Sequence, residues 1–335
     1  MIINDDGTIL GILLFVKHLI PFILFVIGCL FLYYSSESFI DQSILISQKM
    51  NISPIIVGAS VLALGTSLPE LLVSLYSIFK YNNPNDISNL VSSSIIIGNI
   101  LGSNIANVAL VLGYCAFFYK VIFKTNVLKD LLFISFLGTY VISCIYFNIS
   151  INFYHGIVLM ASFIYYFYYL IINNSNEEKY NDNQHINLFY SFFIIIITII
   201  GLSLGTNLIV DNALKISTLL GISELNIGFS IIALGTSLPE LFTAVASIKR
   251  KKYNLLIGNI IGSNILNVIF VLGIASIFTN INVSSDLINN ENLIAVVFVF
   301  SHLVLLLSYL ANKSISKVSG FLLLLMYFFF IFKLL

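Results

Sequence analysis

Residues 58–78, GASVLALGTSLPELLVSLYSI, recur as residues 228–248, GFSIIALGTSLPELFTAVASI, with identical residues at 13 of 21 positions. A second pair follows: residues 98–113, GNILGSNIANVALVLG, match residues 258–273, GNIIGSNILNVIFVLG, at 12 of 16 positions. A repeat that preserved only apolar character would not keep the same polar residues at the same spacing. The sequence therefore contains an internal duplication, and its polar clusters are the first candidates for a function.

The composition is that of a membrane protein. Of the 335 residues, 59% are hydrophobic and 9% are charged, and the mean hydropathy is +1.03. A soluble domain has about 25% charged residues, so a soluble globular protein is excluded. A helix needs about 20 apolar residues to cross a bilayer. Ten segments of about this length are found, at residues 20–47, 53–79, 90–118, 127–147, 151–172, 188–220, 225–248, 254–279, 289–311 and 315–334.

The charged residues are few and balanced. Fifteen Lys and Arg residues cancel fifteen Asp and Glu residues, so no basic surface is available for nucleic acid. Cys29, Cys115 and Cys144 lie in apolar runs without the spacing of a disulfide framework or a zinc site. The first eight residues, MIINDDGT, are acidic where a signal peptide is basic, so we expect residue 1 to begin the mature protein.

The positive charges are distributed unevenly between the predicted loops. Short cytoplasmic loops carry an excess of Lys and Arg. Eleven of the 15 positive residues follow odd-numbered spans, namely Lys49, Lys120, Lys124, Lys129, Lys179, Lys249, Arg250, Lys251, Lys252, Lys313 and Lys317. This asymmetry predicts that both termini lie outside the cytoplasm. The longest polar stretch, residues 173–187, is then a cytoplasmic hinge loop.

The duplication and the number of spans together predict an inverted repeat. Residues 1–172 form a first unit of five helices with its motifs at 58–113, and residues 188–335 form a second unit with its motifs at 228–273. Because five is odd, the two copies cross the membrane in opposite directions. The predicted fold class is an all-α polytopic membrane protein of ten helices, with broken helices at its centre. Secondary transporters with this architecture bind their substrates where the repeats meet, near the membrane midplane.

The motif GTSLPEL places polar groups near the centre of an apolar helix in both copies. These groups are the side chains of Thr66, Ser67, Glu70, Thr236, Ser237 and Glu240. Spacings of three and four residues put them on one helical face, and a Glu at bilayer depth marks a functional site by default. Pro69 and Pro239 lack the N–H that would bond the carbonyl four residues earlier. Each helix is therefore expected to kink or open at its proline.

The second motif, GNxxGSNxxN, adds hydroxyl and amide groups. Ser103 and Asn107 are four residues apart on one helical face, and Ser263 and Asn267 are their counterparts. The glycines of the motif are best explained by close helix packing. Asn99 and its counterpart in the second copy are explained equally well as links between helices and as ligands.

The two motifs offer oxygen ligands only. Ca²⁺ takes about six to eight oxygen ligands, whereas copper, zinc and nickel favour the imidazole and thiolate groups that are missing here. Two glutamates balance one divalent cation or two monovalent cations. Since an empty site with two negative charges is costly in a low dielectric, one ion must leave before others enter. The motifs therefore predict exchange of small hard cations.

Through GTSLPE and GSNxxN in both halves, the sequence resembles the sodium/calcium exchanger branch of the calcium/cation antiporter superfamily, of the prokaryotic type. The resemblance covers essentially the whole chain in the number and order of spans. It implies an antiporter of the cell membrane with four central ion sites, which exchanges Na⁺ for Ca²⁺ by alternating access. It implies no enzymatic activity, cofactor, nucleic acid or obligate protein partner. The ligands that it implies are Glu70 and Glu240, supported by Thr66, Ser67, Ser103, Asn107, Thr236, Ser237, Ser263 and Asn267, with the backbone carbonyls of Ala63 and Ala233.

One position departs from the family pattern. Many relatives have an acidic residue where this chain has Asn267, so the site here is more symmetric and has one carboxylate fewer. An Asp at that position is associated with K⁺ use in the potassium-dependent branch, and its replacement argues against K⁺ dependence. Proton-coupled members usually carry a GNxxE-type motif, which both copies lack, so sodium coupling is favoured. A proton-coupled cation antiporter is the alternative, followed by a passive channel and a membrane scaffold.

Three further acids occur near the ends of predicted helices. Glu37 and Asp41 lie in the first span, and Asp211 is the counterpart of Asp41 in the second copy. Acids in such positions more often cap helices or pair with basic residues near the interface than act in gating or ion entry. We therefore do not count them among the ligands.

Overall fold

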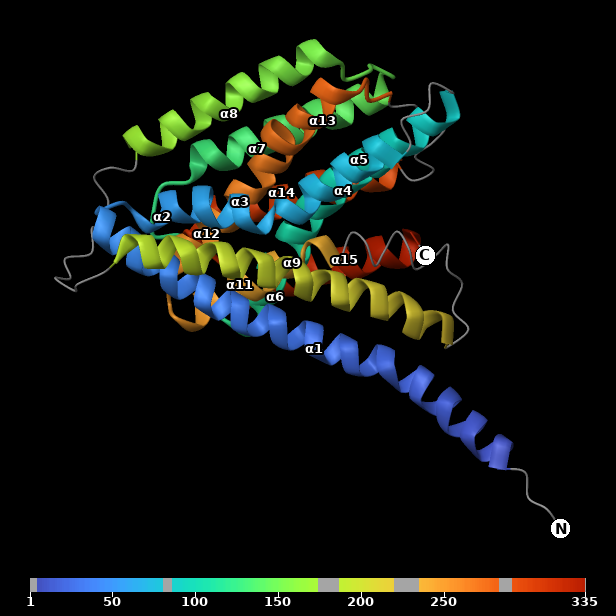
Figure 1. Cartoon of the computed structure of the whole chain (residues 1–335). Helices are drawn as coiled ribbons and strands as arrows, with labels where there is room; N and C mark the ends of the chain where they lie inside the picture. Colours follow the sequence, from blue (N-terminus) through green and yellow to red (C-terminus); the bar gives the residue numbers. More distant parts are fainter. Residues whose placement is uncertain (1–4, 81–85, 174–186, 220–234, 283–290, 335) are drawn as a thin grey trace.

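The structure is a computed structural model, and it describes residues 5–80, 86–173, 187–219, 235–282 and 291–334. Figure 1 shows a bundle composed almost entirely of helices. Most of the predicted hinge loop lies outside the described residues, as does the predicted ligand Ala233.

Helices of the first half follow the predicted spans, with interruptions inside the motif regions. They are α1 (Asp5–Met50), α2 (Pro54–Val57), the π-helix η1 (Gly58–Leu62), α3 (Ala63–Thr66), α4 (Leu68–Lys80), α5 (Asp86–Ile105), the π-helix η2 (Ala106–Leu112), α6 (Gly113–Phe118), α7 (Leu128–Tyr146) and α8 (Phe153–Asn173). A short strand, β1 (Val121–Ile122), precedes α7.

Helices of the second half repeat this order. They are α9 (Leu188–Leu219), α11 (Leu238–Lys249), α12 (Tyr253–Leu266), the π-helix η3 (Asn267–Leu272), α13 (Gly273–Phe278), α14 (Glu291–Asn312) and α15 (Lys317–Leu334). A second short strand, β2 (Ser314–Ile315), lies between α14 and α15. The three π-helices all lie in the repeated motif regions, and π-helical turns are frequent at functional sites.

Eight helices among the described residues are long and apolar enough to cross a membrane. Two of the ten predicted spans are not among them. One is 225–248, of which residues 225–234 lie outside the described part of the chain. The other is 315–334, where α15 has 18 residues, slightly fewer than the about 20 that a span needs. A multi-pass membrane protein is thus supported, and the number of ten spans stays a prediction.

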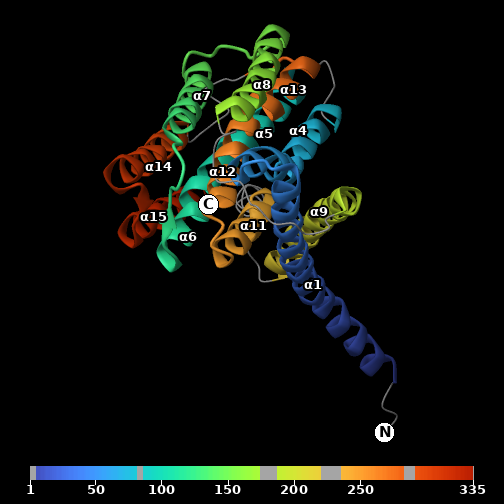
Figure 2. The same cartoon turned by 90° about the vertical axis from the view of Figure 1, so that its left-hand side faces the viewer.

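The motif-bearing helices occupy the middle of the bundle. α12 packs against α2, η1 and α3 of the first half, and α5 packs against α4 and η3. α1 and α9 lie side by side along one flank, and the N-terminal part of α1 extends beyond the bundle (Figures 1 and 2). α7, α8, α14 and α15 surround the other flank (Figure 2). The repeated polar residues are therefore enclosed by helices on several sides.

The backbones of the two halves approach each other closely where Gly58 of η1 faces Gly258 of α12. A Cβ atom at Gly58 would lie 2.7 Å from the carbonyl oxygen of Leu255, and one at Gly258 would lie 2.6 Å from that of Ile55. Such distances are too short for any side chain, so only glycine permits this backbone contact. Each glycine faces the carbonyl oxygen of the residue three positions before the other glycine. The contact therefore joins the first motif of one half to the second motif of the other half.

Two short loop pairings between the halves are reciprocal. β1 pairs antiparallel with β2, with Val121 opposite Ile315, and Ile281 forms an antiparallel bridge with Ile151. Val121 and Ile281 follow the ends of the two repeated GNxxGSN segments at the same distance along the chain. The loop that follows the GNxxGSN segment in each half therefore pairs with the loop before the last helix of the other half, which holds the two units together outside the motif region.

Candidate ion-binding site

The helix that carries each GTSLPEL motif is interrupted just before its proline. α3 ends at Thr66, and α4 begins at Leu68 after Ser67, which has φ −85° and ψ 5°. In the second copy Ser237 has nearly the same conformation, φ −90° and ψ 3°, and precedes α11. The interruption predicted from Pro69 and its counterpart is therefore present. It places each motif glutamate in the first turn of a new helix inside the bundle.

Glu70 and Glu240 are completely buried, with exposed fractions of 0%. Their carboxylates interact electrostatically with each other. Within the described part of the chain, none of their carboxylate oxygens forms a hydrogen bond. Two buried like charges near each other are strongly unfavourable, and a cation between them would offset both.

Hydroxyl groups lie beside each carboxylate, and each pair of hydroxyls combines one residue from each half. They belong to Ser103 and Thr236 beside Glu70, and to Thr66 and Ser263 beside Glu240. The two hydroxyl oxygens are 3.1 Å apart in the first pair and 3.3 Å apart in the second. The two copies of each motif therefore build one shared site rather than two separate ones.

Asn99 and Asn259 hold the hydroxyls of the site to the neighbouring helices. Asn99 donates to the backbone carbonyl of Glu70 at 2.9 Å and accepts a hydrogen bond from Thr236 at 3.5 Å. Asn259 accepts one from Thr66 at 3.3 Å. These contacts support the linking role for both asparagines, which the sequence left open between linking and ligand binding.

Two further asparagines, Asn104 and Asn264, form a reciprocal pair between α5 and α12. Each donates its amide N–H to the other's backbone carbonyl oxygen, and both distances are 3.1 Å. Their amide oxygens accept hydrogen bonds in turn, Asn264 from Asn107 at 2.8 Å and Asn104 from Asn267 at 3.0 Å. The four residues form a hydrogen-bonded chain in the order Asn107, Asn264, Asn104 and Asn267, which crosses the interface between the halves.

These hydrogen bonds determine the orientation of the amide groups of Asn107 and Asn267. Asn104 and Asn264 turn Oδ1 toward Asn267 and Asn107, and an amide oxygen can only accept. Asn107 and Asn267 therefore direct Nδ2 toward the Asn104–Asn264 pair and leave Oδ1 without a hydrogen bond among the described residues. Both oxygens are fully buried, so they remain available as ligands.

Among the candidate ligands, seven buried side-chain oxygens have no hydrogen-bond partner in the described part of the chain. They are Oγ of Ser67, both carboxylate oxygens of Glu70, Oδ1 of Asn107, both carboxylate oxygens of Glu240 and Oδ1 of Asn267. Buried polar atoms almost always have a partner. A cluster of unpaired oxygens that includes both glutamates is a ligand set suited to a hard cation.

The other predicted ligands differ in what they offer. The carbonyl oxygen of Ala63 accepts the Ser67 N–H at 3.0 Å, so one of its lone pairs is already used. Ser237 is buried, with 1% of its surface exposed, and Ala233 lies outside the described residues. No group of three or more His, Cys, Asp or Glu side chains occurs in the described part of the chain. Hydroxyl and amide oxygens must therefore complete the ligand shell.

The acids near the helix ends lie apart from this ligand set. Arg250 forms ion pairs with both Glu37 and Asp41, and two of its nitrogens contact the Asp41 carboxylate at 2.8 and 3.1 Å. Asp211 is exposed. The interpretation of Glu37 and Asp41 as interfacial partners agrees with this arrangement.

Sequence reasoning did not assign roles to Asn104 and Asn264. Both occupy the third position of the repeated GSN triplet, so repetition was the available signal. Their function depends on where α5 and α12 cross, which a single sequence does not reveal.

Comparison with known proteins identifies the family. A family model described as sodium/calcium exchanger protein matches residues 20–172 and 190–335. The chain belongs to the sodium/calcium exchanger family. It is therefore an integral multi-pass membrane protein of an ion-exchanger family, within the calcium/cation antiporter superfamily.

Relatives of this exchanger-family chain cover most of its length. An uncharacterized membrane protein of Methanocaldococcus jannaschii is 35% identical over 262 residues, which is 77% of this chain and 82% of the relative. The sodium/calcium exchanger MaX1 of Methanosarcina acetivorans is 26% identical over 307 residues, covering 79% and 85%. A solved structure of the sodium-calcium exchanger NCX_Mj has a TM-score of 0.76 and 32% identity, and the match covers 93% of this chain and 98% of that chain.

Proposed function

We propose that this chain is a secondary-active antiporter that exchanges Na⁺ for Ca²⁺ by alternating access at one central site. The observation that carries the proposal is the pair of completely buried glutamates, Glu70 and Glu240, whose carboxylates lack hydrogen bonds among the described residues. The exchanger family of the chain and the similarity to MaX1 support Na⁺ and Ca²⁺ as the transported ions.

Charge balance explains why such a site exchanges ions. Two carboxylates are neutralised by one Ca²⁺ or by two Na⁺, so either load leaves no net charge in the low-dielectric interior. The empty site has two uncompensated charges and is costly to rearrange. The protein therefore changes conformation when loaded, and transport in one direction is linked to transport in the other.

The proposed ligands divide by charge and by position. Glu70 and Glu240 supply the negative charge, and Ser67, Asn107 and Asn267 contribute neutral oxygens that have no hydrogen bond in the described structure. Further hydroxyl oxygens come from the residues beside the carboxylates and from Ser237, and further carbonyl oxygens come from Ala63 and Ala233. An all-oxygen shell of adaptable size suits Ca²⁺, which accepts irregular coordination.

The proposal includes an inverted-repeat architecture of ten spans. Its units are residues 1–172 and 188–335, joined by the loop at 173–187. Support comes from the two loop pairings, in which equivalent loops of the two halves make equivalent contacts. The distribution of Lys and Arg supports termini on the non-cytoplasmic side of the cell membrane.

Uptake of ⁴⁵Ca²⁺ into proteoliposomes tests this function. Vesicles are loaded with Na⁺, with K⁺, or with buffer that sets a pH gradient. We expect uptake only with outward-directed Na⁺, and loss of uptake in Glu240→Gln. Uptake driven by the pH gradient instead would favour the proton-coupled alternative, and uptake without any countertransported ion would favour a channel. Either result would contradict Na⁺/Ca²⁺ exchange.

A further inference from the structure

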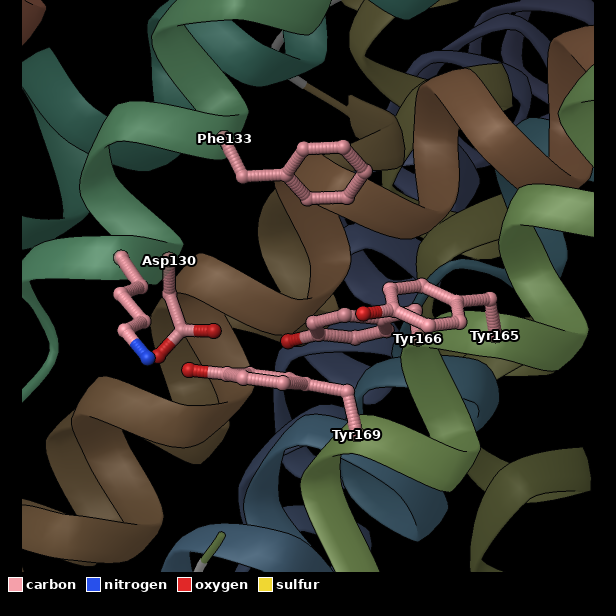
Figure 3. Close-up of a pocket in the computed structure, with 6 residues that line it drawn as sticks. Asp130, Phe133, Tyr165, Tyr166 and Tyr169 are labelled. Carbon is pink, nitrogen blue, oxygen red and sulfur yellow. The ribbon is translucent and has the colours of Figure 1, made fainter.

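A cavity lies between α7 and α8, and none of its lining residues belongs to the candidate ion site. Its volume is about 340 Å³, and it is lined by Lys129, Asp130, Phe133, Tyr165, Tyr166 and Tyr169 (Figure 3). α7 packs against α12 and α14, whereas α8 packs against η3 and α13. The two consecutive helices therefore pack against different neighbouring helices, and the cavity lies in the space between them.

A buried carboxylate forms one wall of the cavity. Asp130, in the first turn of α7, has an exposed fraction of 7%. Lys129 interacts with it electrostatically, but Asp130 forms no ion pair within 4.0 Å in the described part of the chain. A buried carboxylate needs donors of hydrogen bonds to offset its lost hydration. The cavity beside it is where such a donor can bind.

Tyrosine hydroxyls form the opposite wall. Tyr165, Tyr166 and Tyr169 project from α8, and their hydroxyl ends point toward the α7 side of the cavity, that of Tyr169 toward Asp130 (Figure 3). The rings of Tyr166 and Tyr169 are stacked, with centroids 6.5 Å apart. A ligand in the cavity thus meets hydroxyl oxygens and a carboxylate as well as the aromatic rings. This lining suits a cationic group that carries N–H donors.

The depth of the cavity indicates the source of such a group. Asp130 is two residues after the start of α7, and Tyr169 is four residues before the end of α8. These helix ends mark the level at which the chain leaves the hydrocarbon, where tyrosines are enriched in membrane proteins. Phospholipid headgroups lie at the same level, and each carries a phosphate that the exposed Lys129 can contact.

We propose that this cavity binds the headgroup of a phospholipid with a primary ammonium group. The ammonium donates hydrogen bonds to the Asp130 carboxylate and to the tyrosine hydroxyls, and Lys129 contacts the phosphate. A quaternary ammonium headgroup has no N–H to donate, and a glycerol headgroup has no positive charge for Asp130. The cavity has a volume of about 340 Å³, whereas one water molecule takes roughly 30 Å³. The cavity therefore has room for a small polar headgroup.

Native mass spectrometry of the full-length protein in detergent tests this assignment. The probes are dioleoyl phosphatidylethanolamine, phosphatidylcholine and phosphatidylglycerol at equal concentrations. We expect at least about fivefold tighter binding of the ethanolamine lipid, as one or two extra charge-assisted hydrogen bonds provide. Asp130→Asn should abolish that preference, whereas Lys129→Gln should weaken all three lipids similarly. Matched controls are Asp211→Asn and Lys317→Gln, which change exposed residues of other helices.

Several outcomes would overturn the proposal. Equal binding of the three lipids would do so, as would a preference that survives in Asp130→Asn. If that variant does not purify as a folded protein, Tyr169→Phe carries the test against Tyr154→Phe, whose ring is exposed near the other end of α8. Binding of soluble O-phosphoethanolamine distinguishes a lipid site from a site for the free headgroup compound. Tighter binding of the soluble compound than of the lipid would contradict a lipid site. Lipid binding is measured without ion gradients, so it is independent of the proposed transport.

Discussion

Replacing either buried glutamate by glutamine should greatly weaken Ca²⁺ binding, and both replacements should do so to a similar extent. Glu240→Gln preserves shape and one carbonyl oxygen but removes a negative charge from a position with no solvent exposure. Breaking a buried charge pair costs about 3–5 kcal/mol. At about 1.4 kcal/mol per factor of ten, the Ca²⁺ dissociation constant should rise roughly 10²- to 10⁴-fold.

The equivalence of the two positions sharpens this prediction. Each glutamate has a hydroxyl from its own half and one from the other half beside it, so Glu70→Gln should agree with Glu240→Gln within about tenfold. Equilibrium binding of ⁴⁵Ca²⁺ to the purified protein measures both. Glu37→Gln is the matched control, because that carboxylate pairs with Arg250 outside the site, and its dissociation constant should remain unchanged. A change below tenfold in either site variant would refute the reasoning.

Three other changes test the surrounding structure. Asn104→Leu leaves the Asn267 amide nitrogen without its acceptor, and each buried group left unpaired costs about 1–3 kcal/mol. Binding of ⁴⁵Ca²⁺ should therefore weaken, and unchanged affinity would argue against an orienting role of the asparagine chain. Gly58→Ala forces a Cβ to 2.7 Å from a backbone oxygen and should lower the melting temperature. Gly273→Ala, whose Cβ would have its nearest contact at 3.2 Å, should lower the melting temperature less. Equal effects of the two substitutions would contradict the close approach at Gly58. Arg250→Gln removes partly exposed ion pairs worth about 0.2–1 kcal/mol, so thermal unfolding should shift slightly and Ca²⁺ affinity should not change.

Much of the candidate site could be predicted because the chain contains two copies of the same motifs, which can be compared with each other. Repetition of GTSLPEL identified Glu70 and Glu240 without any relative, and the covalent structure of proline predicted the helix interruption. The predicted break concerned the carbonyls of Gly65 and Gly235, and the interruption occurs at Ser67 and its counterpart. Local chemistry along the chain was sufficient for these features.

Features that depend on helix crossings could not be predicted. The π-helix η2 begins at Ala106, between Ser103 and Asn107. The regular i, i+4 spacing of an α-helix therefore does not predict which residues these two side chains contact. Asn107 instead bonds to Asn264, 157 positions away in the sequence. Asp130 likewise has no local signal, because its cavity forms only when α7 and α8 lean on different neighbours. Such contacts depend on tertiary packing rather than on propensity or periodicity.

The position of a bound divalent ion would show whether Glu70 and Glu240 form one shared site. Crystals of the protein grown with Sr²⁺ in place of Ca²⁺ would reveal the ion by its anomalous scattering. We expect a peak with oxygens of both Glu70 and Glu240 in its coordination shell, at distances somewhat above the roughly 2.3–2.6 Å typical of Ca²⁺. A peak coordinated by only one of the two glutamates, or one outside the motif region, would contradict a shared site.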